Sequence, residues 1–184
     1  MRAERSRSSD DMTAASFVCA TCGVSHPGPP LSYGARAPYA YERLSRMNRF
    51  FRASLGSDTC VIRREHFFVL GSISIPVVGR TEAFSWSVWV SLSRPNFGRS
   101  LALWNSPGRE TEPPYFGWLN TLLPGYPSTL SLKTSVQTQP VGIRPAILLE
   151  PTDHPLAIEQ REGISWERVH EIAATVLHRP PHAA

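Results

Sequence analysis

Phe84-Ser-Trp-Ser-Val-Trp-Val-Ser-Leu-Ser93 is the stretch that decides the fold, because apolar residues occupy every second position along it. A period of two places successive side chains on opposite faces of a β-strand. The even-numbered positions are apolar, whereas the odd-numbered ones are serine except for Trp89. A strand with one apolar and one polar face is typical of an antiparallel sheet.

Three further segments predict strands of the same sheet. Residues 69–76 alternate in the same way, and residues 129–139 place Leu130, Leu132 and Val136 on one face. Residues 144–150 are rich in Ile and Leu and predict a fourth strand.

Two helices are expected to follow the strands. Asp153 predicts the cap of the first helix, which Gly163 ends as a residue that tolerates positive φ. Ser165 caps the second helix, whose apolar residues recur at helical spacing. We therefore expect an α+β fold, with a mainly antiparallel sheet and C-terminal helices packed on one sheet face.

The 184 residues and 41% hydrophobic content predict a single globular domain over residues 17–178. Disordered tails are expected at 1–16 and 179–184, and Met12 is an alternative start. No stretch approaches the roughly 20 apolar residues of a membrane span, so no membrane partner is expected. The net charge is +4, but the arginines are scattered along the sequence, which disfavours a nucleic-acid partner. Three cysteines suit a reducing cytoplasm better than a disulfide framework.

A cysteine pair near the N-terminus predicts a metal site. Cys19 and Cys22 are separated by two residues, a spacing that lets two thiolates bind one Zn²⁺ from a tight turn. Gly23 fits this turn because glycine tolerates the positive φ that it needs. We expect one structural Zn²⁺, in a zinc knuckle spanning residues 19–60, with the ligands Cys19, Cys22, His26 and Cys60.

Other interpretations of these residues stay open. The pair would be a redox centre in a thioredoxin-like protein, but such pairs begin a helix, and residues 27–30 (Pro-Gly-Pro-Pro) oppose one. Ordinary free thiols are a further possibility. His154 or His66 would replace His26 as a ligand. If Cys60 is a buried hydrophobic residue instead, the site has an open position for a reactive water.

Several motifs in order resemble one known family. They are Cys19-x-x-Cys22-Gly23-x-x-His26, Asp58-x-Cys60-Val61, the serine-rich strand 84–93, Val141-Gly-Ile-Arg-Pro145 and Glu150-Pro-Thr-Asp-His154-Pro-Leu-Ala157. Over residues 17–178 the chain is similar to an uncharacterised bacterial family, domain of unknown function 2199. The resemblance implies a bacterial single-domain protein with a cysteine pair at its head, and it transfers no activity.

The polar face of the predicted sheet is a candidate binding surface. Serines leave it nearly uncharged, and Trp89 would stack on a ligand there if it is exposed. If another segment covers this face, Trp89 is a buried core residue instead. The candidate binding residues are Trp89, Lys133, Gln137 and Gln139.

Polar residues around the last predicted strand are the catalytic candidates: Arg144, Glu150, Asp153 and His154. His154 beside a carboxylate would act as a general base, and Arg144 would bind an anionic group. In the structural interpretation, Asp153 caps a helix, Arg144 pairs with Glu150 or Glu159, and His154 lies in the first helical turn. We expect a zinc-stabilised cytoplasmic module that binds a protein or small molecule. The alternative is a hydrolase-like enzyme that uses His154 with neighbouring carboxylates, or an open zinc site.

Overall fold

The computed structural model describes residues 17–18, 23, 25–26 and 28–177; the tails expected at 1–16 and 179–184 lie outside the described residues. The helices are α1 (Tyr39–Glu42), α2 (Arg46–Arg52), α3 (Arg94–Ala102), α4 (Pro155–Glu162) and α5 (Trp166–Leu177), with a 3-10 turn at Arg109–Thr111. The strands are β1 (Phe17–Val18), β2 (Ser25–His26), β3 (Ser32–Gly34), β4 (Ala53–Leu55), β5 (Thr59–Ile62), β6 (His66–Ile75), β7 (Phe84–Leu92), β8 (Tyr115–Leu119), β9 (Lys133–Gln137) and β10 (Ala146–Leu149). The expected α+β class is confirmed.

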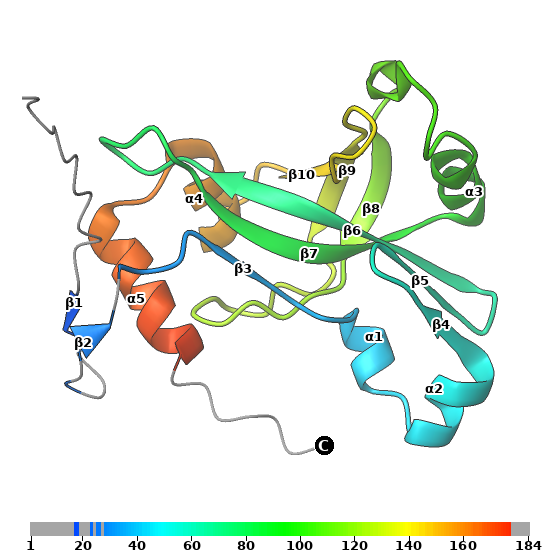
Figure 1. The fold of residues 1–184 in the computed structure, drawn as a ribbon, viewed down its shortest axis with the longest axis horizontal. Helices are drawn as coiled ribbons and strands as arrows, with labels where there is room; N and C mark the ends of the chain where they lie inside the picture. The colour runs from blue at the N-terminus through cyan, green and yellow to red at the C-terminus, as the bar shows by residue number, and fades with distance from the viewer. Residues whose placement is uncertain (1–16, 19–22, 24, 27, 178–184) are drawn as a thin grey trace, which may run out of the picture.

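Five strands close into a barrel in the order β6-β7-β8-β9-β10. Neighbours along this order are antiparallel, and β10 returns to β6 in the parallel direction, with Ala146 opposite Ser72. Gly71 permits this closure, because a Cβ there would lie 2.5 Å from Ile147 Cδ1 and 2.8 Å from the carbonyl oxygen of Pro145. The remaining strands extend the sheet, with β3 beside β7 and the β4–β5 hairpin beside β6 (Figure 1).

The apolar face of β7 forms the main core, as its alternation predicts. Phe84, Trp86 and Val88 are at most 2% exposed and lie inside the barrel with the inward residues of β6. Leu156 of α4 and Ile172 of α5 join the same core, so the C-terminal helices cover it as expected. Burial of this continuous apolar interior is the main favourable contribution to folding.

A second core lies on the opposite face of β6 and β7. It contains Cys60, Ile62, Phe68, Leu70 and Trp89, and residues of the segment 35–44 pack against it. The first half of β6 is therefore buried on both faces, which explains why its sequence is apolar at consecutive positions. Three serines of β7, Ser85, Ser87 and Ser91, lie on this face and are partly exposed.

Two expectations about local structure are corrected. Strand β9 is shorter than the expected 129–139, because Ser131 adopts a left-handed φ of 60° and the chain turns there. The cap of α4 is His154 and not Asp153, since the His154 ring Nδ1 accepts the N–H of Leu156 at 3.2 Å. Gly163 ends α4 and Ser165 begins α5, as expected.

Candidate functional site

The outward side of β8, β9 and β10 carries exposed apolar residues; we call it the outer barrel face. Phe116 of β8, Ser135 of β9 and Leu148 of β10 are directly opposite one another on adjacent strands. Phe116 is 52% exposed and Leu148 is 50% exposed, with the small Ser135 between them. Trp118, two residues along β8, packs edge-to-face on Phe116 at 5.1 Å between ring centroids. Large side chains on both sides of a small one form a hollow.

This hollow has a volume of about 320 Å³ and ends at an ion pair. Lys133 Nζ lies 3.3 Å from Glu150 Oε2, and both side chains are half exposed. The backbone sets this pair, because Glu150 N–H donates to the carbonyl oxygen of Lys133 at 3.0 Å. Pro114 and Pro151 complete the wall. The arrangement combines an apolar floor with one positive and one negative group at its rim.

The catalytic candidates do not converge on one site. Arg144 Nε lies 2.7 Å from Asp58 Oδ1, which helps to lower the pKa of Asp58 although burial acts in the opposite sense. Glu150 pairs with Lys133, and Asp153 is exposed before α4. His154 caps the helix with Nδ1, while its buried Nε2 has no hydrogen-bond partner among the described residues. Arg144 therefore forms an ion pair, as in the structural interpretation, but its partner is Asp58 and not the expected Glu150 or Glu159.

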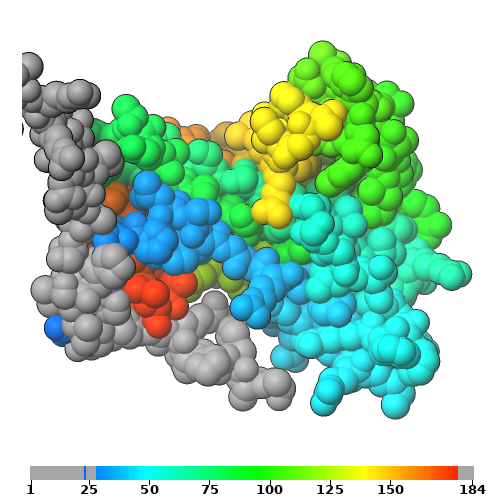
Figure 2. Space-filling view, viewed as in Figure 1, coloured from blue at the N-terminus to red at the C-terminus, as the bar shows by residue number. Residues whose placement is uncertain are grey.

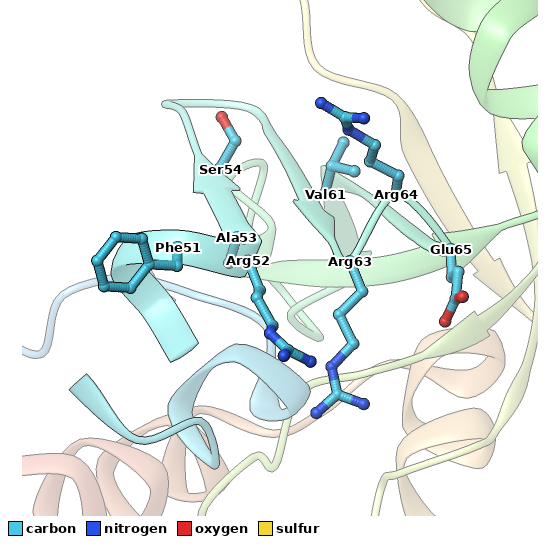
Figure 3. A pocket seen from close by; sticks show the side chains of 8 residues that line it. All are labelled: Phe51, Arg52, Ala53, Ser54, Val61, Arg63, Arg64 and Glu65. Carbon is cyan, nitrogen blue, oxygen red and sulfur yellow. The ribbon is translucent and has the colours of Figure 1, made fainter. Parts of the chain in front are cut away.

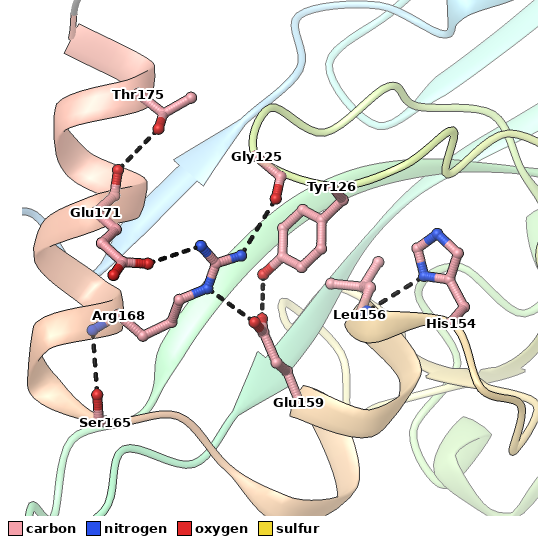
Figure 4. A network of polar contacts seen from close by, with 9 residues as sticks. All are labelled: Gly125, Tyr126, His154, Leu156, Glu159, Ser165, Arg168, Glu171 and Thr175. Atoms are coloured by element: carbon pink, nitrogen blue, oxygen red, sulfur yellow. Dashed lines mark hydrogen bonds and ion pairs between the residues drawn. The ribbon is translucent and has the colours of Figure 1, made fainter.

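The most connected polar network joins α4, α5 and the loop before β9. Arg168 Nε donates to Glu159 Oε1 at 2.8 Å, and its Nη2 donates to the carbonyl oxygen of Gly125 at 3.2 Å (Figure 4). Tyr126 Oη donates to Glu159 Oε2, and burial together with this carboxylate raises the pKa of Tyr126. His154 stands apart from this network in Figure 4. The polar groups of the network form hydrogen bonds and ion pairs with one another. The network therefore holds the loop before β9 against α4 and α5.

Trp89, a candidate binding residue if it were exposed, is buried. Its side chain is 1% exposed, and its Nε1 donates to the carbonyl oxygen of Ala35 at 3.1 Å. The segment that follows β3 therefore covers it, which was the other interpretation of the sequence. Gln137 projects outward at the far end of β9, and Gln139 lies beyond it, where its carbonyl oxygen accepts from buried Arg109. Of the predicted binding residues, Lys133 alone lies in the hollow.

The structure does not bring the two described zinc candidates together. Cys60 is 0% exposed in the second core, and burial raises the pKa of its thiol to about 11. His26 belongs to the β1–β2 hairpin, which lies at the opposite end of the molecule from β5 (Figure 1). Cys19 and Cys22 lie outside the described residues, so the zinc site stays a prediction. Among the residues that are described, no three potential ligands gather.

Sequence reasoning missed Phe116, Trp118 and Leu148. The segment Tyr115–Leu119 reads Tyr-Phe-Gly-Trp-Leu, an apolar run in which no polar residue marks the outward face. The only available signal was its length, since five apolar residues between prolines and a polar turn fit a strand.

In a comparison with protein families, the chain matches the family of uncharacterised proteins conserved in bacteria, domain of unknown function 2199, over residues 18–164. No curated protein and no solved structure matches the chain. None of the described helices is long and apolar enough to cross a membrane.

Proposed function

Since the chain belongs to this bacterial family, as its motifs indicate, and the family carries no known activity, we propose from the geometry alone that it is a binding module. The outer barrel face is the proposed binding site. The partner is a peptide segment of another protein, which inserts an apolar side chain between Phe116 and Leu148. The rim groups Lys133 and Glu150 then orient the peptide through its own polar groups.

One observation carries the proposal: the barrel exposes a row of large apolar side chains on β8 and β10, with only the small Ser135 of β9 between them. The row is Trp118 and Phe116 on β8 with Leu148 on β10, and each side chain is at least 42% exposed. Single exposed apolar residues are ordinary on a protein surface, whereas a contiguous patch with a polar rim is typical of an interaction site. Exposed aromatic residues around a hollow are also typical of the residues that dominate binding energy.

The proposal also includes a structural zinc ion and a cytoplasmic location for the protein. A Zn²⁺ bound by Cys19 and Cys22 would stabilise the N-terminal segment, and a cytoplasmic location agrees with cysteines that need no disulfide. Cys60 is a free thiol.

Selection from a random peptide library displayed on phage tests the proposal. Peptides selected by the wild-type protein are synthesised, and their dissociation constants are measured by fluorescence anisotropy. We expect Phe116→Ser and Leu148→Ser each to weaken binding about tenfold or more, as hot-spot residues do. Val78→Ser is the matched control, since Val78 is 69% exposed in the β6–β7 turn. Selected peptides that bind both variants as tightly as the wild type would refute the proposed site.

A further inference from the structure

Helix α2 presents apolar side chains to solvent and buries none. Met47, Phe50 and Phe51 are 72%, 81% and 74% exposed, and they lie at positions i, i+3 and i+4 on one side of the helix. A seven-residue helix does not persist alone in water. Here the Ser45 hydroxyl caps it, and Arg49 donates to the carbonyl oxygens of Tyr41 and Glu42. The helix is held in place while its apolar side stays uncovered.

Arginines from two segments lie near these apolar residues. Arg46 and Arg52 belong to α2, and Arg63 and Arg64 form the tip of the β5–β6 hairpin. Arg52 and Arg63 point to the same side of this hairpin, whereas Arg64 points to the opposite side (Figure 3); all three line, with Phe51 and Val61, a hollow of about 550 Å³. Figure 2 shows the segment with α2, β4 and β5 at one corner of the molecule. We call Arg46, Met47, Phe50, Phe51, Arg52, Arg63 and Arg64 the arginine–phenylalanine surface.

These guanidinium groups have no carboxylate partner among the described residues. The ion pairs of the described chain involve Arg99, Lys133, Arg144 and Arg168, all elsewhere in the fold. Glu65 is the one acidic residue that lines the hollow. The charge that appears scattered in the sequence is therefore concentrated and unpaired in space.

The hairpin tip carries arginine where the backbone favours other residues. Arg63 and Arg64 have φ of 53° and 58°, and Glu65 N–H donates to the carbonyl oxygen of Ile62 at 3.0 Å. A turn with two positive φ angles favours Asn and Gly, which adopt this region with little strain. Arginine at both positions makes this turn less stable than Asn and Gly would, and it places two positive charges at the tip of the β5–β6 hairpin.

We propose that the arginine–phenylalanine surface docks the protein on an anionic lipid bilayer. A helix with exposed aromatic residues on one side and arginines around them is typical of segments that lie in the membrane interface. The apolar side chains enter the boundary between headgroups and acyl chains, and the guanidinium groups bind lipid phosphates. The sequence predicts no membrane partner because it has no apolar span, but docking at the interface needs none.

The protruding shape favours a bilayer over an acidic peptide or a nucleic acid. Phe50 and Phe51 pack edge-to-face on each other at 4.9 Å between centroids and are more exposed than any other large apolar residue described. A deformable lipid surface surrounds both projecting rings, whereas an extended peptide or strand in the adjoining hollow would leave Phe50, which does not line it, uncovered. Each arginine near an anionic surface strengthens binding about fivefold, so four of them make the attraction measurable even with shallow insertion.

Vesicle co-flotation of the full chain tests the docking. The probes are vesicles of phosphatidylcholine alone and vesicles with 30% phosphatidylglycerol. We expect binding to the anionic vesicles only, weakened by 0.5 M NaCl. Phe50→Ser with Phe51→Ser should weaken it at least tenfold, and Arg63→Asn with Arg64→Gly about thirtyfold. The second pair of changes suits the turn, so the melting temperature should hold or rise, and lost folding cannot explain lost binding.

Control variants change exposed apolar residues or arginines elsewhere in the chain. Val141→Ser with Ile143→Ser removes exposed apolar residues from the β9–β10 connection, and Arg80→Gln with Arg161→Gln removes two charges; both should bind like the wild type. Failure to bind anionic vesicles overturns the proposal. Vesicle binding that is unchanged in the Phe50→Ser, Phe51→Ser variant also overturns it. So does phenylalanine-dependent binding to polyglutamate or to poly(dT) that is tighter than binding to the anionic vesicles. The peptide selection at the outer barrel face is independent of these results.

Discussion

The indole Nε1 of Trp89 donates a 3.1 Å hydrogen bond to the carbonyl oxygen of Ala35, which ties the segment after β3 to the outer side of the β6–β7 hairpin. The backbone of Trp89 is held on the other side, where its N–H donates to Thr121 Oγ1 at 2.8 Å. Trp89 is therefore the centre of the second core and joins three parts of the chain.

Replacing Trp89 should destabilise the protein strongly. Trp89→Ala removes a 1%-exposed side chain and leaves the Ala35 carbonyl without its donor, so we expect a loss of about 3–5 kcal/mol in the free energy of unfolding. Trp118→Ala, at a 42%-exposed position, should lose less than about 1 kcal/mol. Urea denaturation followed by circular dichroism measures both. A small loss for Trp89→Ala would mean that the second core contributes little.

The sequence predicts those elements whose residues alternate or recur with one period. β7, α4 and α5 are correct because their polar residues mark an exposed side. The sequence did not establish the second core, since Trp89 among serines left both a buried residue and an exposed platform open. Its burial depends on residues 35–44, which show no period that relates them to β7.

Closure of the barrel and the arginine–phenylalanine surface are tertiary features. The contact between β10 and β6 requires Gly71, because any larger side chain there would clash with Ile147. Neither residue type indicates in the sequence that the other lies next to it. Arg63 and Arg64 approach α2 because β4 and β5 pair in between, so their proximity follows from two hairpins and not from spacing. The sequence therefore underestimates the charge clustering that the fold creates.

The Glu159–Arg168 pair should contribute more to stability than the neighbouring Arg168–Glu171 pair. Glu159 is 16% exposed and also accepts from Tyr126, whereas Glu171 is 66% exposed. Glu159→Gln should cost about 1–3 kcal/mol because it leaves a half-buried guanidinium without a full partner. The matched change Glu171→Gln should cost less than about 0.5 kcal/mol. Equal losses in urea denaturation would show that burial does not distinguish the pairs.

Alkaline pH should destabilise the protein through Cys60. Burial raises the pKa of this thiol from 9.0 to about 11. Well below pH 9 the thiol is protonated in both the folded and the unfolded protein, so the free energy of unfolding keeps its full value. Between pH 9 and 11 the unfolded state loses the proton first, and stability falls by about 2–3 kcal/mol. Cys60→Val, which keeps the site apolar, should lack this part of the decline. Urea denaturation from pH 8 to pH 11 under reducing conditions compares the two proteins; identical slopes would contradict the prediction.

Zinc binding should depend on Cys19 and Cys22 and not on Cys60. The sequence alone predicts that Cys60→Ser releases the metal, but Cys60 lies in the second core, at the opposite end of the molecule from His26. We therefore expect about one equivalent of Zn²⁺ to co-purify with the wild type and with Cys60→Ser, and to be lost from Cys19→Ser and Cys22→Ser. Cys60→Ser should instead lose about 1–3 kcal/mol of stability, because it buries a hydroxyl among apolar side chains. Elemental analysis and urea denaturation of the same samples separate the two roles. Loss of zinc from Cys60→Ser would show that Cys60 is a ligand after all. Absence of zinc from the wild type would show that Cys19 and Cys22 are free thiols.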